Sequence, residues 1–361
     1  MTLDRRFVQS SLVHSSLVQR GLVCLAAVVL CAAPLAAQGT HFNTAGNILI
    51  CDQFNNQVLE VNPNTHEVVW IFGSGSSVAG AGAVVAPNDA QRVGSLTLIA
   101  GTGAPAGSEP SCPNGCPDNR VMLVNPQGQI TWQYGQAGVS GSGYNQLNTP
   151  VQATYLPDGT VLITDQVNER VIRVSKDLKI LWQYGTTGIT GTGFNQLNNP
   201  NSAELLKNGH VLIADENNNR VIEVETVSHN IVWQYGDPSN TSILNGAAFA
   251  SRLPNLNTLI TDSNNNRILE VDAAKNVVNT YYTNGRPGSV ANPFPTRAVR
   301  LRNGNTLISD QYNDQVIEID SYGTIVYSQG SIGIPGMGFN LLNAPYDAKV
   351  VGDYTGLTSP R

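Results

Sequence analysis

Short apolar runs separated by turn residues recur along most of the chain. In the clearest copy, four such runs cover residues 202–206, 210–214, 220–224 and 230–235. The first two are joined by Asn208-Gly209, a pair that favours the positive φ angles of a hairpin turn, and the second ends at Asp215. Runs of this length between Asn- and Gly-rich turns predict β-strands, so the pattern predicts a unit of four short strands.

The four-strand unit repeats at a nearly fixed interval. The aspartate that ends its second strand recurs at Asp52, Asp165, Asp215, Asp262 and Asp310. From Asp165 onward the intervals are 50, 47 and 48 residues, and a degenerate copy with an insert at residues 102–116 lies between Asp52 and Asp165. Such a period with four strands per unit is typical of the blade of a β-propeller. We therefore predict an all-β fold, a six-bladed β-propeller of four-stranded antiparallel blades.

The two ends of the repeat region predict how the ring closes. The first copy begins near residue 43 and lacks the inner strand that follows a proline in the other copies. Residues 338–351, at the other end of the chain, match residues 193–206 of the complete copy. We therefore expect the C-terminal strand to pair with the first blade, which leaves no open sheet edge in the ring.

The first 37 residues predict a secretory signal peptide. Three arginines precede an apolar run over residues 21–37, and the run ends in small residues. We expect cleavage after Ala37, which leaves residues 38–361 as a single propeller domain of a secreted protein, periplasmic or extracellular, with no stable membrane span. An uncleaved anchor helix is the alternative, although the run is short for a bilayer.

The composition fits a turn-rich fold and narrows the possible partners. Only 13% of the residues are charged, 35 are glycine, and the formal net charge is −6. Glycine at this level fits a fold with many tight turns. Because the acidic balance comes without clusters of Lys or Arg, we predict no nucleic-acid partner.

Export changes the interpretation of the cysteines. Cys112 and Cys116 bracket a Pro-Asn-Gly turn in the insert, and in an oxidising compartment we expect them to form a disulfide. Cys51 lies in an apolar strand where other copies carry Thr, Ala or Ser, so we interpret it as a small buried residue. A metal site made of the three cysteines is the alternative, but no histidine lies at ligand spacing.

Two residue patterns recur in most blades. Aromatic residues occupy one place in the fourth strand, namely Trp70, Trp132, Trp182, Trp233 and Tyr327. We interpret this place as packing between blades, with a cofactor-stacking surface as the alternative. The motif Asp-x-x-Asn-x-Arg, as in Asp215, Asn218 and Arg220, resembles a catalytic set when seen once. Its repetition favours a turn in which the carboxylate accepts backbone N–H groups and pairs with the arginine.

The repeated motif resembles that of a known family. Gly-x-Gly-Phe-Asn-x-Leu-Asn-x-Pro, followed by Asn-Gly, an apolar strand and Asp-x-x-Asn-x-Arg, is similar to the NHL repeat over residues 41–351. This resemblance implies a six-bladed propeller. It does not choose a function, because the family includes binding modules, lactonase-like hydrolases and lyases.

The candidate site comprises inner-strand positions at which the copies differ. We expect them at one mouth of the central channel, as Asn88, Asp89, Gln152, Asn201, Ser202, Arg297, Tyr346 and Asp347. Asp89 and Asp347 should come from adjacent blades. Resemblance to lactonase-like propellers implies calcium here, and Asp89, Asp347, Asn88 and Asn201 supply the oxygen atoms that Ca²⁺ prefers. The alternative is a hydrated mouth in which Arg297 neutralises one aspartate.

The function that we predict is binding. His41, His66, His210 and His229 fall outside the expected mouth, so a histidine-dependent mechanism lacks its base. We predict a non-enzymatic binding or scaffold module that takes a protein, glycan or small ligand on a loop face, with contacts at residues 102–116, 237–246 and 281–295. The alternatives are a calcium-dependent lactonase-like hydrolase or lyase at the channel mouth, and a structural envelope component that self-associates.

Overall fold

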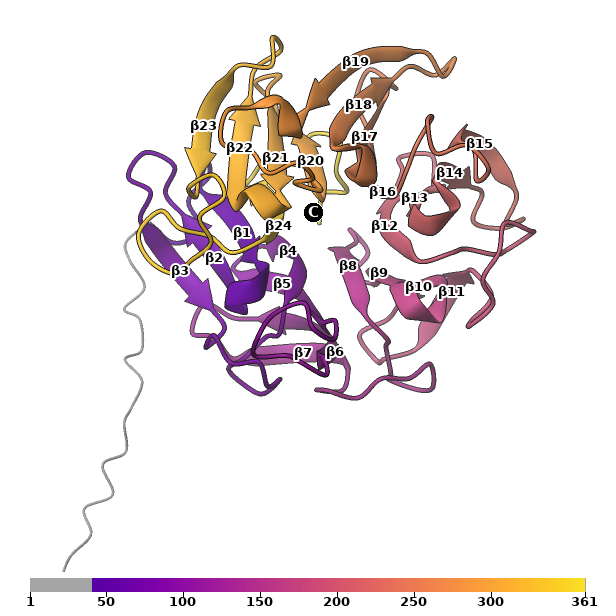
Figure 1. Cartoon of the computed structure of the whole chain (residues 1–361). Coiled ribbons are helices and arrows are strands. Elements are labelled where there is room, and N and C mark those ends of the chain that lie inside the picture. Colours follow the sequence, from indigo (N-terminus) through magenta and orange to yellow (C-terminus); the bar gives the residue numbers. More distant parts are fainter. Residues whose placement is uncertain (1–40, 361) are drawn as a thin grey trace, which may run out of the picture. The chain divides into compact units, whose positions relative to one another are not determined.

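The computed structural model describes residues 41–360, and the predicted signal peptide lies outside them. Six four-stranded antiparallel sheets surround a central axis (Figure 1). These six sheets confirm the six-bladed β-propeller that the repeats predict. Within residues 41–360 no helix is long and apolar enough to cross a membrane.

Each blade is one sheet, whose strands follow one another from the inner to the outer edge. Blade 1 contains β24 (Pro345–Val350), β1 (Ile48–Asp52), β2 (Gln57–Val61) and β3 (Val68–Phe72). Blade 2 contains β4 (Pro87–Val93), β5 (Leu96–Ala104), β6 (Cys116–Val124) and β7 (Ile130–Gly135). Blade 3 contains β8 (Pro150–Tyr155), β9 (Val161–Asp165), β10 (Arg170–Val174) and β11 (Ile180–Tyr184).

The second half of the ring follows the same order. Blade 4 contains β12 (Pro200–Leu205), β13 (Val211–Asp215), β14 (Arg220–Val224) and β15 (Ile231–Gly236). Blade 5 contains β16 (Ala247–Arg252), β17 (Thr258–Asp262), β18 (Arg267–Val271) and β19 (Val277–Tyr282). Blade 6 contains β20 (Arg297–Arg300), β21 (Thr306–Asp310), β22 (Gln315–Ile319) and β23 (Ile325–Gln329).

Short 3₁₀ helices follow the second strand of five blades. They are η1 (Gln53–Asn55), η2 (Gln166–Asn168), η3 (Glu216–Asn218), η4 (Ser263–Asn265) and η6 (Gln311–Asn313), and η5 (Thr283–Gly285) follows β19. The Asp215 carboxylate stabilises the turn that follows it. It accepts hydrogen bonds from Asn218 Nδ2 at 2.8 Å, from Arg220 Nε at 2.7 Å and from the backbone N–H of Asn198 at 2.7 Å. These contacts confirm that the repeated motif is turn chemistry.

The C-terminal strand closes the ring as predicted. β24 pairs with β1 in antiparallel register, with Ala348 opposite Ile50. The inner strands contact one another in the order β24, β4, β8, β12, β16, β20 and back to β24. No inner strand is therefore left without a neighbour on either side.

Side chains of the fourth strands join neighbouring blades. The indole N–H of Trp70 donates to the carbonyl of Pro126, and that of Trp182 to the carbonyl of Thr226, in each case in the third-to-fourth-strand turn of the next blade. This agrees with packing between blades. Two cysteine predictions are also confirmed, because Cys112 and Cys116 form a disulfide and Cys51 is free and buried.

Candidate functional site

Four charged side chains meet in the central channel. Asp89 Oδ1 accepts hydrogen bonds from Lys349 Nζ at 2.7 Å and from Arg297 Nη2 at 3.1 Å. Asp347 Oδ1 lies 3.1 Å from Arg297 Nε, and Asp347 Oδ2 accepts a hydrogen bond from Lys349. Two carboxylates and two cations give this cluster no net charge. We call these four residues the channel cluster.

The channel cluster is almost completely withdrawn from solvent. Asp89 and Asp347 are each 1% exposed, Arg297 is fully buried and Lys349 is 8% exposed. Burial raises the pKa of Asp89, against the lowering effect of Lys349. Burial alone would lower the pKa of Lys349, but the two aspartates raise it above its ordinary value. Lys349 therefore stays charged, and the cluster depends on mutual pairing rather than on water.

Polar side chains of the inner strands also bind the backbone of the next blade. In four consecutive blades, the side chain just before the inner-strand alanine accepts a hydrogen bond from the backbone N–H of the equivalent alanine in the next blade. The pairs are Asp347 with Ala90, Asp89 with Ala153, Gln152 with Ala203, and Ser202 with Ala250. At the two remaining positions stand Phe249 and Arg297, whose guanidinium lies 4.4 Å from the Phe249 ring centre. Most of the predicted site residues thus hold the blades together.

A side chain spans one mouth of the channel. Tyr346 on β24 and Asn201 on β12 come from opposite sides of the ring, and the phenolic oxygen lies 2.9 Å from Asn201 Nδ2. Asn201 Nδ2 also donates to Glu216 of η3 at 2.9 Å. Burial raises the pKa of the Tyr346 phenol, so it remains neutral and can donate in turn to Asn201 Oδ1. This mouth is bridged by protein rather than open.

The C-terminal tail, residues 352–360, covers the other mouth. The backbone N–H of Thr358 donates to Glu204 Oε2 at 3.0 Å, and Gln91 Nε2 donates to the carbonyl of Thr358 at 3.1 Å. The hydroxyl of Tyr354 donates to the carbonyl of Arg92 at 2.9 Å. The chain accordingly ends at the centre of the ring (Figure 1). Sequence reasoning missed this tail because it follows the last repeat and matches no copy.

The predicted calcium ligands do not fit a cation in this arrangement. Both aspartates are occupied by Arg297 and Lys349, and Asn88 Oδ1 accepts a hydrogen bond from Gln53 at 2.8 Å. Across residues 41–360 no group of three or more His, Cys, Asp or Glu side chains is placed to hold a metal ion. The sequence did not single out Lys349, and this residue pairs with both of the aspartates that were predicted to bind calcium. It lies two positions after Asp347 on the same strand and therefore on the same face.

Three connecting loops expose aromatic rings beside the 3₁₀ helices. They cover residues 135–149, 185–199 and 330–344, and we call them the aromatic loops. Tyr144, Phe194 and Phe339 are 74%, 70% and 73% exposed, whereas the leucine three positions after each ring is fully buried. None of the three loops contains a charged residue. The leucine, not the ring, is therefore what anchors each loop to the core.

Each aromatic loop has a fixed conformation at its ring. The asparagine that follows the ring has φ 52° in all three loops. Its side-chain oxygen accepts the N–H of the glycine that begins the loop, at 2.8 Å for Asn145, 2.9 Å for Asn195 and 3.0 Å for Asn340. A small residue that tolerates a left-handed backbone thus fixes the backbone next to each exposed ring.

Part of the insert in blade 2 extends the strands β5 and β6 instead of forming a loop. β5 continues through Ala104 and β6 begins at Cys116, so only residues 105–115 leave the sheet. The hairpin is longer because Ala104 and Cys116 still pair across the two strands. The Cys112–Cys116 disulfide then closes the tip.

Asp52 differs from its counterparts in the other blades. Asp165 and Asp215 pair with an arginine five residues later and Asp310 pairs with Arg286, whereas Asp52 has only Gln57 beside it, at 3.0 Å. Burial raises the pKa of Asp52 to about 6, against the lowering effect of the Asn343 backbone N–H. The folded protein therefore holds this proton more tightly than the unfolded chain does, and stability falls as the pH rises from about 4 to 6, by about 3 kcal/mol at most.

We expect the substitution Gln57→Arg to reduce this dependence. A guanidinium beside Asp52 would favour the charged carboxylate, as Arg220 does at Asp215, where burial still keeps the pKa above its ordinary value. Melting temperatures measured between pH 4 and 8 should therefore fall less for the variant than for the wild type, and the variant should be the more stable above pH 6. Parallel curves for the two proteins would contradict this explanation.

Comparisons with solved structures agree with the fold. The chain is similar to a protein of unknown function from Bacteroides caccae, with 16% identity and a TM-score of 0.56 over 79% of this chain and 93% of that one. A streptogramin B lyase matches with 12% identity and a TM-score of 0.48 over 81% and 84%. Neither a protein-family model nor a curated protein sequence matches the chain. At these identities the likeness concerns the fold alone. Fold and geometry together define a six-bladed propeller whose channel is bridged at one mouth and covered at the other.

Proposed function

We propose that this protein is an exported, non-enzymatic binding module whose aromatic loops contact a neutral glycan. One observation carries the proposal: three fixed loops expose an aromatic ring at the same repeated position, and none of them carries a charge. Single exposed apolar residues are common on protein surfaces. Repeated rings at equivalent loop positions are not explained by packing, since the buried leucines already anchor the loops.

The chemistry of the loops favours a sugar polymer. Aromatic rings stack on the apolar faces of sugar rings, and the Asn, Gln, Ser and Thr side chains around them hydrogen-bond hydroxyl groups. Loops without charge provide no attraction for an acidic or basic partner. Rings repeated around one face suit a partner that itself repeats, because several weak contacts on one polymer raise the overall affinity.

Other features support export and the absence of catalysis at the channel. The disulfide is typical of an oxidising compartment, in agreement with the predicted signal peptide over residues 1–37. The resemblance to NHL repeats is compatible with a binding role. In the channel, Asp89 and Asp347 are paired and buried, and Tyr346 and the tail restrict both mouths. A substrate that entered the channel would therefore meet these two aspartates already paired with Arg297 and Lys349.

The test is binding to insoluble neutral polysaccharides such as cellulose, chitin and xylan. We expect the combined substitution of Tyr144, Phe194 and Phe339 by alanine to weaken binding by about 100-fold or more, since exposed aromatic anchors each contribute on the order of 1–2 kcal/mol. Stability should hardly change because the rings are exposed. Tyr322→Ala, which removes a 92% exposed ring from a third-to-fourth-strand turn outside the aromatic loops, is the matched control.

Two outcomes would contradict the proposal. If the wild type bound none of the neutral polysaccharides, the assignment of a glycan would be wrong. If the triple variant bound as well as the wild type, the aromatic loops would not be the site.

A further inference from the structure

A group of three side chains recurs where one blade meets the next. A glutamate on the third strand pairs with an arginine on the inner strand of the following blade, and the guanidinium lies over a tryptophan on the fourth strand. Between blades 1 and 2 the group is Glu60, Arg92 and Trp70, with 4.6 Å from guanidinium to ring centre. Between blades 4 and 5 it is Glu223, Arg252 and Trp233, with 4.8 Å.

The junction between blades 5 and 6 keeps the ion pair but lacks the ring. Glu270 accepts a hydrogen bond from Arg300 Nη2 at 2.8 Å, and the equivalent glutamate and arginine also pair in the other two groups. Trp70 lies opposite Glu60 and Trp233 opposite Glu223, whereas Glu270 lies opposite Asn279. A short amide therefore stands where a large indole stands elsewhere.

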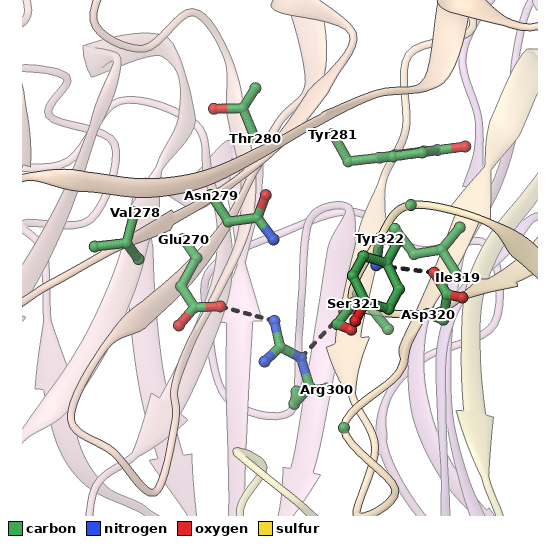
Figure 2. Close-up of a pocket in the computed structure, with 13 residues that line it drawn as sticks. Glu270, Val278, Asn279, Thr280, Tyr281, Arg300, Ile319, Asp320, Ser321 and Tyr322 are labelled. Carbon is green, nitrogen blue, oxygen red and sulfur yellow. Dashed lines mark hydrogen bonds and ion pairs between the residues drawn. The ribbon is translucent and has the colours of Figure 1, made fainter.

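A cavity occupies the place of the missing ring. Its volume is about 370 Å³, and it is lined by Asn279, Tyr281, Arg300, Ile319 and Tyr322, among others. Figure 2 shows the Glu270–Arg300 pair on one side and the rings of Tyr281 and Tyr322 on the other. This volume lies in the range of pockets that hold small organic ligands.

The cavity also contains a backbone position that receives an indole N–H in other blades. Trp70, Trp132 and Trp182 each donate to the carbonyl of the second residue after the third strand of the next blade, namely Pro126, Lys176 and Thr226. In blade 6 that residue is Ser321, which lines the cavity. The junction thus has the cation and ion-pair partner that lie beside Trp70 and Trp233, and the backbone position that accepts the indole N–H of Trp70, Trp132 and Trp182.

We propose that this cavity binds a neutral, planar heteroaromatic molecule of about the size of indole that carries a ring N–H. The ring would take the place of the absent tryptophan and lie against the Arg300 guanidinium, which attracts the face of an aromatic ring. Its N–H would donate to the Ser321 carbonyl. This site is formed by β18 to β22 and the turn after β22, so it is separate from the aromatic loops and does not depend on the proposed glycan binding.

Indole itself is the probe, titrated into the full chain and followed by ligand-detected NMR. We expect saturable binding at one site, and a weakening of at least about 5-fold for N-methylindole, because the hydrogen bond to a carbonyl contributes on the order of 1 kcal/mol. Asn279→Trp should fill the cavity, abolish indole binding and raise the melting temperature. Val232→Trp adds an indole at an exposed position of β15 and should leave indole binding unchanged.

A second variant keeps the test decisive if Asn279→Trp fails to fold. Asn279→Tyr introduces the residue that the chain carries at the same place in blade 6, Tyr327, and should also block indole. The proposal is overturned if the wild type shows no saturable binding of indole, or if the folded position-279 variants bind it as the wild type does.

Discussion

Replacing Arg297 with methionine is expected to destabilise the protein by about 3–5 kcal/mol. The substitution removes one of two cations from a cluster in which Asp89 and Asp347 are each 1% exposed. Lys349 alone then faces two buried carboxylates, and an uncompensated buried charge is among the costliest defects in a folded protein. Urea denaturation should show the loss directly, and a loss below about 1 kcal/mol would mean that the cluster does not hold the ring together.

A matched control comes from an exposed ion pair. Arg173 pairs with Asp158, and the two side chains are 33% and 48% exposed. Arg173→Met should change the unfolding free energy by less than about 1 kcal/mol, because water already screens this pair. The comparison separates loss of an arginine from loss of the buried pairing.

Ending the chain at Asn343 is expected to abolish cooperative folding. This truncation removes β24, which pairs with β1, and with it Asp347 and Lys349 of the channel cluster. β1 would become an open edge, and the apolar side chains around Ala348 would lose their cover. Calorimetry or circular dichroism should show no sharp melting transition.

A shorter truncation separates the contribution of the tail from that of the strand. A chain that ends at Val351 keeps β24 but loses the hydrogen bonds of Thr358 to Glu204. We expect it to fold and to melt at a lower temperature than the full chain, since the hydrogen bonds of the tail to Glu204 and Gln91 are lost. An unchanged transition in the chain ending at Asn343 would contradict closure of the ring by β24.

The repeats predicted the fold because each strand and turn is encoded locally. The Asn-Gly hairpins, the Asp-x-x-Asn-x-Arg turns and the match of residues 338–351 to 193–206 fix blade number and closure without any knowledge of long-range contacts. The same comparison placed Asp89 and Asp347 near the channel. Lys349 escaped notice because its partners come from two strands, β4 and β24, and only the ring brings them together.

Exposure was harder to predict than position. The motif Gly-Phe-Asn-x-Leu contains two apolar residues, and the sequence does not tell which one enters the core. The structure buries Leu197 and exposes Phe194. By contrast, the cavity between blades 5 and 6 has a signal in the sequence. The fourth strand of blade 5 is the one copy with no aromatic residue at the repeated place, where Asn279 stands instead.

The most direct test of the proposed binding role is amide hydrogen exchange of the full chain, with and without a soluble oligosaccharide derived from the polysaccharide that it binds. Contact through the aromatic loops predicts slower exchange in residues 135–149, 185–199 and 330–344, with the inner strands β4, β20 and β24 unchanged. Protection confined to those inner strands, with the loops unaffected, would place the ligand in the channel and contradict the account.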